Sequence, residues 1–346
     1  MISRITLQTQ RSAVTSSILA VIGACLAGAI LLLLTGHNPW TAYRLIVERG
    51  LLDWDGLSES LKKMAPLLII TAGLLTCLRA GIWNIGIDGQ VVIGAIACGV
   101  VAGELVGDLP RALLLITGAV VGGLAGGLWA LGPAVLTARF GLNEIITTIM
   151  MNYLAFNLVS WLVKGPVKAP DIVTAQTKQI PVDDRLPDLP YTDIHIGLII
   201  GVIAIVIVWL LFRETVPGTM LDVLGRNRRA AKHAGLPVTR LIVGAFLVSG
   251  AAAGLAGAID VLGVFGLFKA SYQPGYGFVA FALAYLARLR SIAVIPFAAF
   301  LSVLVIGGDA MSRRADVPTD FVPVLEGLML LFFALAVWFE GRGGAV

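Results

Sequence analysis

Apolar runs long enough to cross a lipid bilayer recur along this chain. The first, residues 12–34, reads SAVTSSILAVIGACLAGAILLLL and carries no charged side chain. A helix needs about 20 apolar residues to span the hydrocarbon core, whereas the apolar region of a signal peptide is shorter and ends in a small-residue cleavage site. Only 13% of the 346 residues are charged, against roughly 25% in a soluble domain. The sequence therefore predicts an all-α polytopic membrane protein.

Ten spans fit the hydropathy pattern, and we expect residues 1–346 to form a single transmembrane domain. The eighth span is too short to cross alone at roughly 1.5 Å per residue, so tilting, an extension from residue 272 onward, and a re-entrant course all stay open. An even number of spans places both termini on one side of the membrane. The predicted spans are 12–34, 60–79, 85–106, 111–135, 143–163, 195–212, 241–262, 277–287, 292–307 and 321–339.

Basic residues favour an orientation with both termini in the cytoplasm. Lys and Arg are enriched in cytoplasmic loops, and their densest cluster lies in the loop 213–240. The loop 164–194 is then extracytoplasmic and mixes lysines with aspartates. Totals on the two sides are nearly equal, so the orientation rests on this cluster: Arg226, Arg228, Arg229 and Lys232. Membrane topology accounts for the net charge of +4 without a nucleic-acid partner.

Residues 81–90, GIWNIGIDGQ, are polar and rich in glycine although they lie between two apolar runs. Such residues survive at membrane depth only where protein or a water-filled cavity surrounds them. A second irregular stretch, 263–277, follows the seventh span at the matching place in the second half of the chain. Interrupted segments at matching places in two inverted halves point to a midplane binding site, whereas two surface loops are the alternative. We expect two inverted-repeat-like halves with broken segments at 81–90 and 263–277.

Four residues of the first broken segment are candidates for a substrate path. Asn84, Asp88 and Gln90 offer donors and acceptors for hydroxyls, amides or a base edge, and Trp83 offers a flat apolar face for a ring. Asp88 is an intramembrane carboxylate, which is a functional candidate by default. It can equally cap the helix start expected at residues 89–92, so capping and substrate contact both stay open.

Aromatic residues of the second segment are further candidates. Phe265, Phe268 and Tyr272 can stack on a sugar or nucleobase, gate a pore, or belong to an interfacial aromatic belt. Asp260 lies near the end of the seventh span, where we expect its carboxylate to reach toward the interface.

The fifth span carries polar residues on one face. Glu144, Thr148 and Asn152 follow a spacing of four residues, so they share a helix face. We expect this face to point into the bundle, because polar groups facing lipid are costly. Both helix–helix hydrogen bonding and pore lining fit this placement for Glu144 and Asn152.

Glycine recurs every four residues in three spans. Such rows let helices approach closely, which predicts a tightly packed bundle rather than a particular dimer. The rows are Gly99, Gly103 and Gly107; Gly118, Gly122 and Gly126; and Gly250 and Gly254.

The sequence lacks the motifs that are typical of several other classes of function. No GxxxxGK[ST] loop is present, so the chain holds no P-loop nucleotide site of its own, and neither HExxH nor GxSxG suggests an enzyme. Cys25, Cys77 and Cys98 lie in apolar runs without CxxC spacing, which argues against a disulfide framework and a metal site. We therefore expect a transport protein that binds neither a cofactor nor a metal.

Residues 219–235, TMLDVLGRNRRAAKHAG, are predicted to form one short helix of basic and small residues. Gly235 and the following Pro237 mark its end. A basic helix of this kind can bind anionic lipid headgroups or dock into a groove on a cytoplasmic partner.

Three motifs in this order resemble permease subunits of nucleoside and simple-sugar ABC importers. GIWNIGIDGQVVIGA is similar to a segment often written GLFNIGVEGQ in that family. LNEIITTIMMNYLAFNLVSWLVKGPVK resembles the NE-x-I-x-TIM-x-NY stretch of the nucleoside-type subgroup, and LGRNRRAAKHAGL resembles the G-x-N-x-x-AA-x-x-AGI segment that couples to the ATPase. The resemblance covers roughly residues 57–335. Two departures are Asp88, where Glu is usual, and Arg228-Arg229 in place of a frequent Pro-Glu.

The resemblance implies a permease in the bacterial inner membrane that works with three kinds of partner. These are ATP-binding subunits that hold ATP and Mg²⁺, a second permease that is homologous or identical, and an extracytoplasmic solute-binding protein. It also implies that the pore-side segment maps onto Asn84, Gly86, Asp88, Gly89 and Gln90. The ATPase-coupling positions are Leu224, Gly225, Asn227, Ala230, Ala231, Ala234 and Gly235.

We therefore expect the chain to form the import path for a nucleoside or a related purine-type or sugar-like solute. Alternatives are a monosaccharide cargo, a secondary transporter that uses Asp88 or Glu144 as a proton-linked carboxylate, and a membrane-embedded assembly or receptor protein without a path. The candidate path residues are Trp83, Asn84, Asp88, Gln90, Glu144, Asn152, Phe265, Phe268 and Tyr272.

Overall fold

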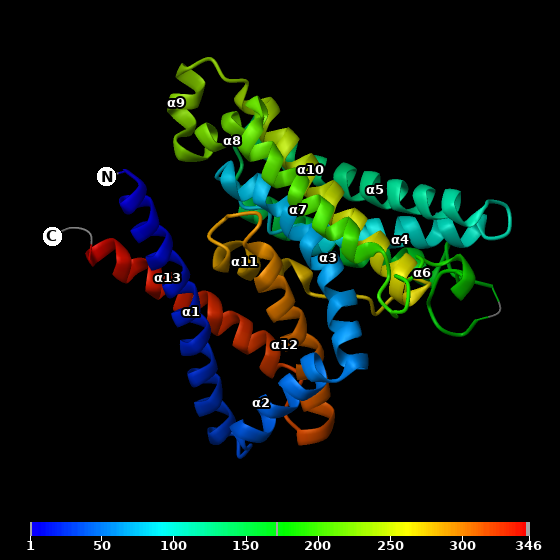
Figure 1. Ribbon diagram of the computed structural model, residues 1–346. Helices are drawn as coiled ribbons and strands as arrows, with labels where there is room; N and C mark the ends of the chain where they lie inside the picture. The colour runs from blue at the N-terminus through cyan, green and yellow to red at the C-terminus, as the bar shows by residue number, and fades with distance from the viewer. Residues whose placement is uncertain (1, 171, 344–346) are drawn as a thin grey trace. The chain divides into compact units, whose positions relative to one another are not determined.

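The computed structural model describes residues 2–170 and 172–343, and within them the regular secondary structure is helical (Figure 1). Eight of these helices are long and apolar enough to cross a membrane, and two shorter apolar stretches are Ile18–Leu34 of α1 and Tyr276–Leu286, which is α11. The all-α polytopic fold is thereby confirmed. The helices that match the predicted spans are α1 (Ile2–Leu34), α3 (Trp54–Arg79), α4 (Ile87–Leu105), α5 (Arg111–Phe140), α6 (Glu144–Lys164), α7 (Gly197–Glu214), α10 (Val238–Asp260), α11 (Tyr276–Leu286), α12 (Val294–Ala315) and α13 (Phe321–Gly343).

The eighth predicted span is a short helix. α11 has 11 residues, which reach about 16 Å at roughly 1.5 Å per residue, against a hydrocarbon core of about 30 Å. Residues 272–275 are not helical, so the helix does not extend to residue 272. α11 therefore begins at Tyr276, near the end of the second broken segment.

The chain divides into two compact units, Met1–Lys63 with Phe281–Val346, and Met64–Ala280. In the first unit α1 packs against α13, while α2 (Pro39–Val47) and the π-helix η1 (Glu48–Leu52) pack against α12. Hydropathy does not predict α2, although Pro39 at its first position is a known start signal. The Asn38 side chain caps it by accepting hydrogen bonds from the backbone of Trp40 and Thr41. A single transmembrane domain over residues 1–346 remains a prediction.

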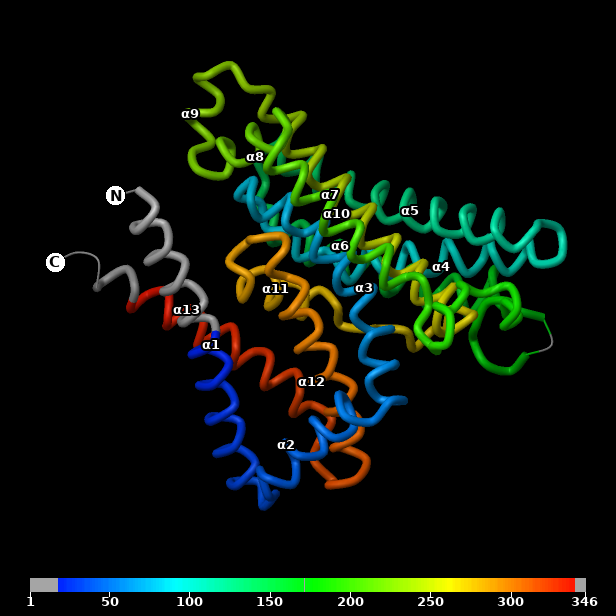
Figure 2. Tube along the Cα trace, in the orientation of Figure 1, coloured from blue at the N-terminus to red at the C-terminus, as the bar shows by residue number. Residues whose placement is uncertain are grey.

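Glycine contacts hold together the core of the second unit, where α10 runs along α4 and α5 (Figure 2). A Cβ atom at Gly254 would lie 2.2 Å from the carbonyl oxygen of Gly122, and one at Gly94 would lie 2.3 Å from the Cα atom of Gly254. Gly126 and Gly250 make similar backbone contacts. The tight helix packing predicted from the rows that contain Gly122 and Gly254 is confirmed within one chain. The third row differs, because Gly99 and Gly103 face Phe268 and Lys178 outside the long helices and nothing lies within 4 Å of a Cβ atom at Gly107.

The segment 219–235 forms parts of two helices, so the prediction of one uninterrupted helix is wrong. α8 (Val216–Arg226) ends where α9 (Arg228–His233) begins, and the residue between them, Asn227, is extended, with φ −159° and ψ 102°. Its Oδ1 atom accepts hydrogen bonds from the backbone N–H groups of Arg229 and Ala230, each at 3.0 Å. An asparagine side chain that bonds the backbone in this way competes with a continuous helix. The expected end at Gly235 agrees with its positive φ of +78°.

Replacing Gly254 by alanine is expected to destabilise the second unit by about 1–3 kcal/mol, because the new methyl group forces α5 and α10 apart. Gly244→Ala on the same helix is the matched control, since nothing lies within 4 Å of its added Cβ atom. The midpoint of thermal unfolding in detergent checks the difference. Equal midpoints for the two variants would contradict this account of the packing.

Candidate functional site

Two side-chain amides close the first break. Residues 80–86 are not helical and connect α3 to α4. Asn84 and Gln90 exchange two hydrogen bonds, each of 3.0 Å, and Asn84 Nδ2 also donates to Ser249 Oγ of α10 at 2.9 Å. Both amides are buried, with 0% and 1% of their surface exposed. They therefore fasten the break to α10, and their polar atoms are used within the protein.

Asn152 of α6 supplies the cap that α4 lacks. Gly86, at the N-cap position of α4, has no side chain to offer the first N–H groups. Asn152 Oδ1 accepts from the backbone N–H of Gly89 at 2.7 Å, and its Nδ2 donates to the carbonyl oxygen of Ile85 at 2.9 Å. For Asn152, the structure thus shows the helix–helix hydrogen bonding that the sequence left open. Thr148 is buried on the same face, and Glu144 is half-buried at the start of α6.

Asp88 caps a helix, but not the one expected. It lies in the first turn of α4, and its Oδ1 atom accepts from the backbone N–H of Gly277 in the first turn of α11, at 2.8 Å. The positive end of the α11 dipole favours this carboxylate. A Cβ atom at Gly277 would lie 2.6 Å from Asp88 Oδ2, so glycine permits the approach. This bond joins two broken segments that are 189 residues apart in sequence.

The second break begins as a π-helix and contains a buried carboxylate. η3 (Val261–Phe265) follows α10 directly, and residues 266–275 are not helical. Asp260 Oδ2 accepts hydrogen bonds from the hydroxyls of Tyr272 at 2.8 Å and Tyr276 at 2.5 Å. Only 2% of Asp260 is exposed. The expectation that it reaches toward the interface is wrong, because two tyrosines satisfy it inside the protein.

Aromatic rings gather beside this carboxylate. The Tyr272 ring meets those of Phe265 and Phe268 edge to face, with centroids 5.6 and 5.4 Å apart. Phe268 is buried, whereas Phe265 is 44% exposed; in the first break, Trp83 is 41% exposed. Among the candidate path residues, Trp83 and Phe265 therefore present the large apolar surfaces that remain open.

Part of the loop 164–194 runs along the second break, and no sequence pattern predicts this contact. In residues 175–186, Thr177 exchanges hydrogen bonds with the backbone of Phe268, and the N–H of Ile180 donates to the carbonyl of Gly266 at 2.7 Å. Arg185 donates to the carbonyl oxygens of Ile180 and Val264. Hydropathy gives no signal for the contacts with Val264, Gly266 and Phe268, because these residues lie about 80 to 90 residues further along the chain.

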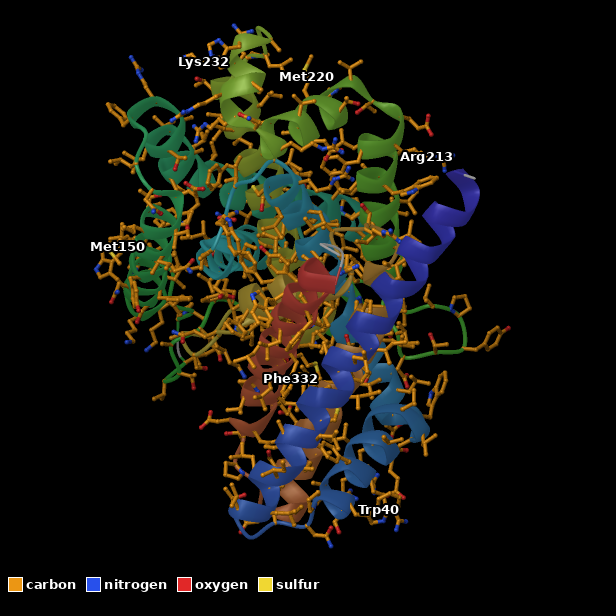
Figure 3. All side chains as sticks on the ribbon, turned by 90° about the vertical axis from the view of Figure 1, so that its left-hand side faces the viewer. Trp40, Met150, Arg213, Met220, Lys232 and Phe332 are labelled. Atoms are coloured by element: carbon orange, nitrogen blue, oxygen red, sulfur yellow. The ribbon has the colours of Figure 1, made fainter. Side chains whose placement is uncertain are left out.

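The coupling positions inferred from resemblance lie on α8, at Asn227 between α8 and α9, on α9, and in the turn that follows. Leu224 and Ala231 are buried, and Lys232 between the later positions is exposed (Figure 3). The exposed coupling positions are Gly225, Asn227, Ala230, Ala234 and Gly235.

Comparison with known proteins identifies relatives over nearly the whole chain. A glucose ABC transporter permease protein of Haloferax volcanii, TsgB13, is 31% identical over 93% of this chain and 87% of its own length. The guanosine ABC transporter permease protein NupP of Bacillus subtilis is 30% identical over 92% of each chain. The nucleoside ABC transporter permease protein NupB of Lactococcus lactis subsp. cremoris is 29% identical over 92% of this chain and 90% of its own.

A family model matches most of the chain as well. It is described as the permease component of the branched-chain amino acid transport system, and it covers residues 56–334. That range contains both broken segments, the α8–α9 pair and all three motifs. The chain therefore belongs to this family of ABC transporter permeases.

Proposed function

We propose that the chain forms the translocation path of an ATP-driven importer for a nucleoside or a related purine-type or sugar-like solute. The observation that carries this proposal is the similarity, over about nine-tenths of each chain, to permeases named for guanosine and nucleosides. The motifs in α4, in α6 and at α8–α9 support it. In this role the chain makes and breaks no covalent bond.

The proposed importer divides its work among several subunits. ATP and Mg²⁺ bind to separate ATP-binding subunits that dock on α8 and α9, and a second, homologous or identical permease completes the path. A binding protein delivers the solute outside the bacterial inner membrane, and both termini of this chain lie in the cytoplasm. ATP-driven closure of the ATPases then switches the path between outward and inward access.

We assign the contacts with the solute to the exposed aromatic residues, and the support of the path backbone to the buried polar residues. Trp83 and Phe265 belong to segments that meet through Asp88 and Gly277, so they can stack on the faces of a base or sugar ring. Asn84, Gln90 and Asn152 hold the backbone of the path. Asp88 is engaged as a cap, which argues against a proton-linked carrier built on that carboxylate. The name of the Haloferax relative favours a monosaccharide as the second candidate cargo.

Uptake into proteoliposomes that hold this chain, its partner subunits and the binding protein tests the proposal. We expect uptake of labelled guanosine to require ATP and to survive collapse of the proton gradient. Excess unlabelled nucleosides should compete, whereas glucose should not. Uptake that persists without ATP or the partners would contradict the importer proposal. Competition by glucose alone would indicate a sugar rather than a nucleoside as the transported solute.

Removing either open aromatic face should weaken solute binding in the path. We expect Trp83→Ala and Phe265→Ala each to raise the KM of uptake about tenfold, which corresponds to about 1.4 kcal/mol of lost stacking. Trp161→Ala is a matched control, because Trp161 is 63% exposed on α6 outside both breaks. An unchanged KM in both break variants would refute the assignment.

The role of Asp88 can be separated by two substitutions. Asp88→Asn keeps an oxygen that accepts from Gly277, so we expect most uptake to remain. Asp88→Ala loses the cap, worth about 1 kcal/mol, and should lower both folded yield and uptake. Gel filtration and initial uptake rates measure these effects. If the asparagine variant were as inactive as the alanine variant while folding normally, the charge itself would be required.

A further inference from the structure

An ion pair outside the candidate path ties α8 to the end of α3. Arg79 Nε donates to Asp222 Oδ1 at 2.8 Å, and Arg79 Nη2 donates to the other carboxylate oxygen. The Arg79 guanidinium also lies over the Phe212 ring of α7, 3.8 Å from its centroid. The two charged side chains are 25% and 27% exposed. A two-pronged, partly shielded pair of this kind fixes orientation as well as distance.

The backbones of the two segments touch beside this pair. Gly81, with φ +70°, begins the first break two residues after Arg79, and a Cβ atom there would lie 3.1 Å from the Cα atom of Gly225. A Cβ atom at Gly225 would lie 2.0 Å from the Arg79 carbonyl oxygen. Leu221 and Leu224 are buried on the same helix. Because the two backbones are in direct contact, a movement of α8 relative to residues 79–81 would break these contacts.

A short chain of contacts continues from this point to both breaks. Asn84, five residues beyond Arg79, is fastened to Gln90 and to Ser249 of α10. Asp88 then holds the N-terminus of α11 through Gly277. A displacement that starts at α8 can therefore pass along the backbone to the first break, which carries Trp83, and through the Asp88–Gly277 bond to the start of α11.

We propose that Arg79 and Asp222 are positioning residues for transport, which convert a movement of α8 into a movement of the first break. The inference rests on the proposed ATP-driven function. Neither residue touches solute or nucleotide in this scheme. Their ion pair holds α8, which docks on the ATPase, at a fixed position relative to the first break, which shapes the path.

A role in coupling differs from a role in stability by its effect on the ratio of solute moved to ATP hydrolysed. A pair that only stabilises the fold lowers the amount of active complex, so transport and hydrolysis fall together. A pair that transmits movement lets hydrolysis continue while transport falls. The complete reconstituted complex, with ATPases, second permease and binding protein, is therefore the system to measure.

We expect Arg79→Gln and Asp222→Asn each to lower guanosine uptake per ATP hydrolysed at least fivefold. The double variant Arg79→Asp with Asp222→Arg restores opposite charges across the contact and should recover at least half of the ratio. Arg213→Gln is the matched control, because Arg213, also on α7, pairs with Glu214 at 2.9 Å and lies 4.9 Å from the Trp209 ring centroid. It should leave the ratio unchanged.

The outcomes separate this inference from the function on which it rests. Wild-type complex that shows no ATP-dependent uptake would overturn both. If the wild-type complex is active but both single variants keep the same uptake per ATP hydrolysed, the role of the ion pair alone would be overturned. An equal loss in Arg213→Gln would have the same consequence. Failure of the charge exchange to recover the ratio, in complex that elutes as a single folded species, would also overturn it.

Discussion

A helix that begins within a bilayer leaves backbone N–H groups that lipid cannot satisfy, and after both breaks of this chain a side chain from another helix accepts a hydrogen bond from such a group. Asn152 of α6 accepts from Gly89 at the start of α4, and Asp88 of α4 accepts from Gly277 at the start of α11. Each cap joins two elements as well as satisfying a donor. The bond between Asp88 and Gly277 therefore satisfies a donor and also fixes the two breaks to one another.

Those bonds depend on how closely the helices approach. The amide of Asn84 reaches Ser249 because α10 lies directly against α4, with Gly94 and Gly257 leaving room for backbone contact. Larger residues at these points would move the serine out of hydrogen-bond range and leave a buried amide without that partner, at a cost of about 1–3 kcal/mol. Glycine packing in the bundle thus sets the geometry of the site.

Local patterns in the sequence predict the spans and the broken segments, because hydropathy and glycine content act over neighbouring residues. Partners that lie far along the chain escape such patterns. Asp88 can be recognised as a cap from its type, but nothing near it in sequence indicates that its helix is α11. Asp260 was misjudged for the same reason, since its tyrosine donors fold back from beyond the break. The break at Asn227 is different, because an asparagine side chain that competes with a helix can be recognised from the local sequence.

The second unit holds each break at a different point along α10. The 23 residues of α10 extend about 35 Å at roughly 1.5 Å per residue. The helix runs from the turn after α9 to the π-helix η3. The first break is anchored to α8 through Arg79, and the second is paired with residues 175–186 of the loop. Since Asp88 joins the two breaks, a displacement at either anchor changes the strain on the other. In the proposed importer, ATPase docking at α8 and movement of the loop would both act on the path through these bonds, as alternating access requires.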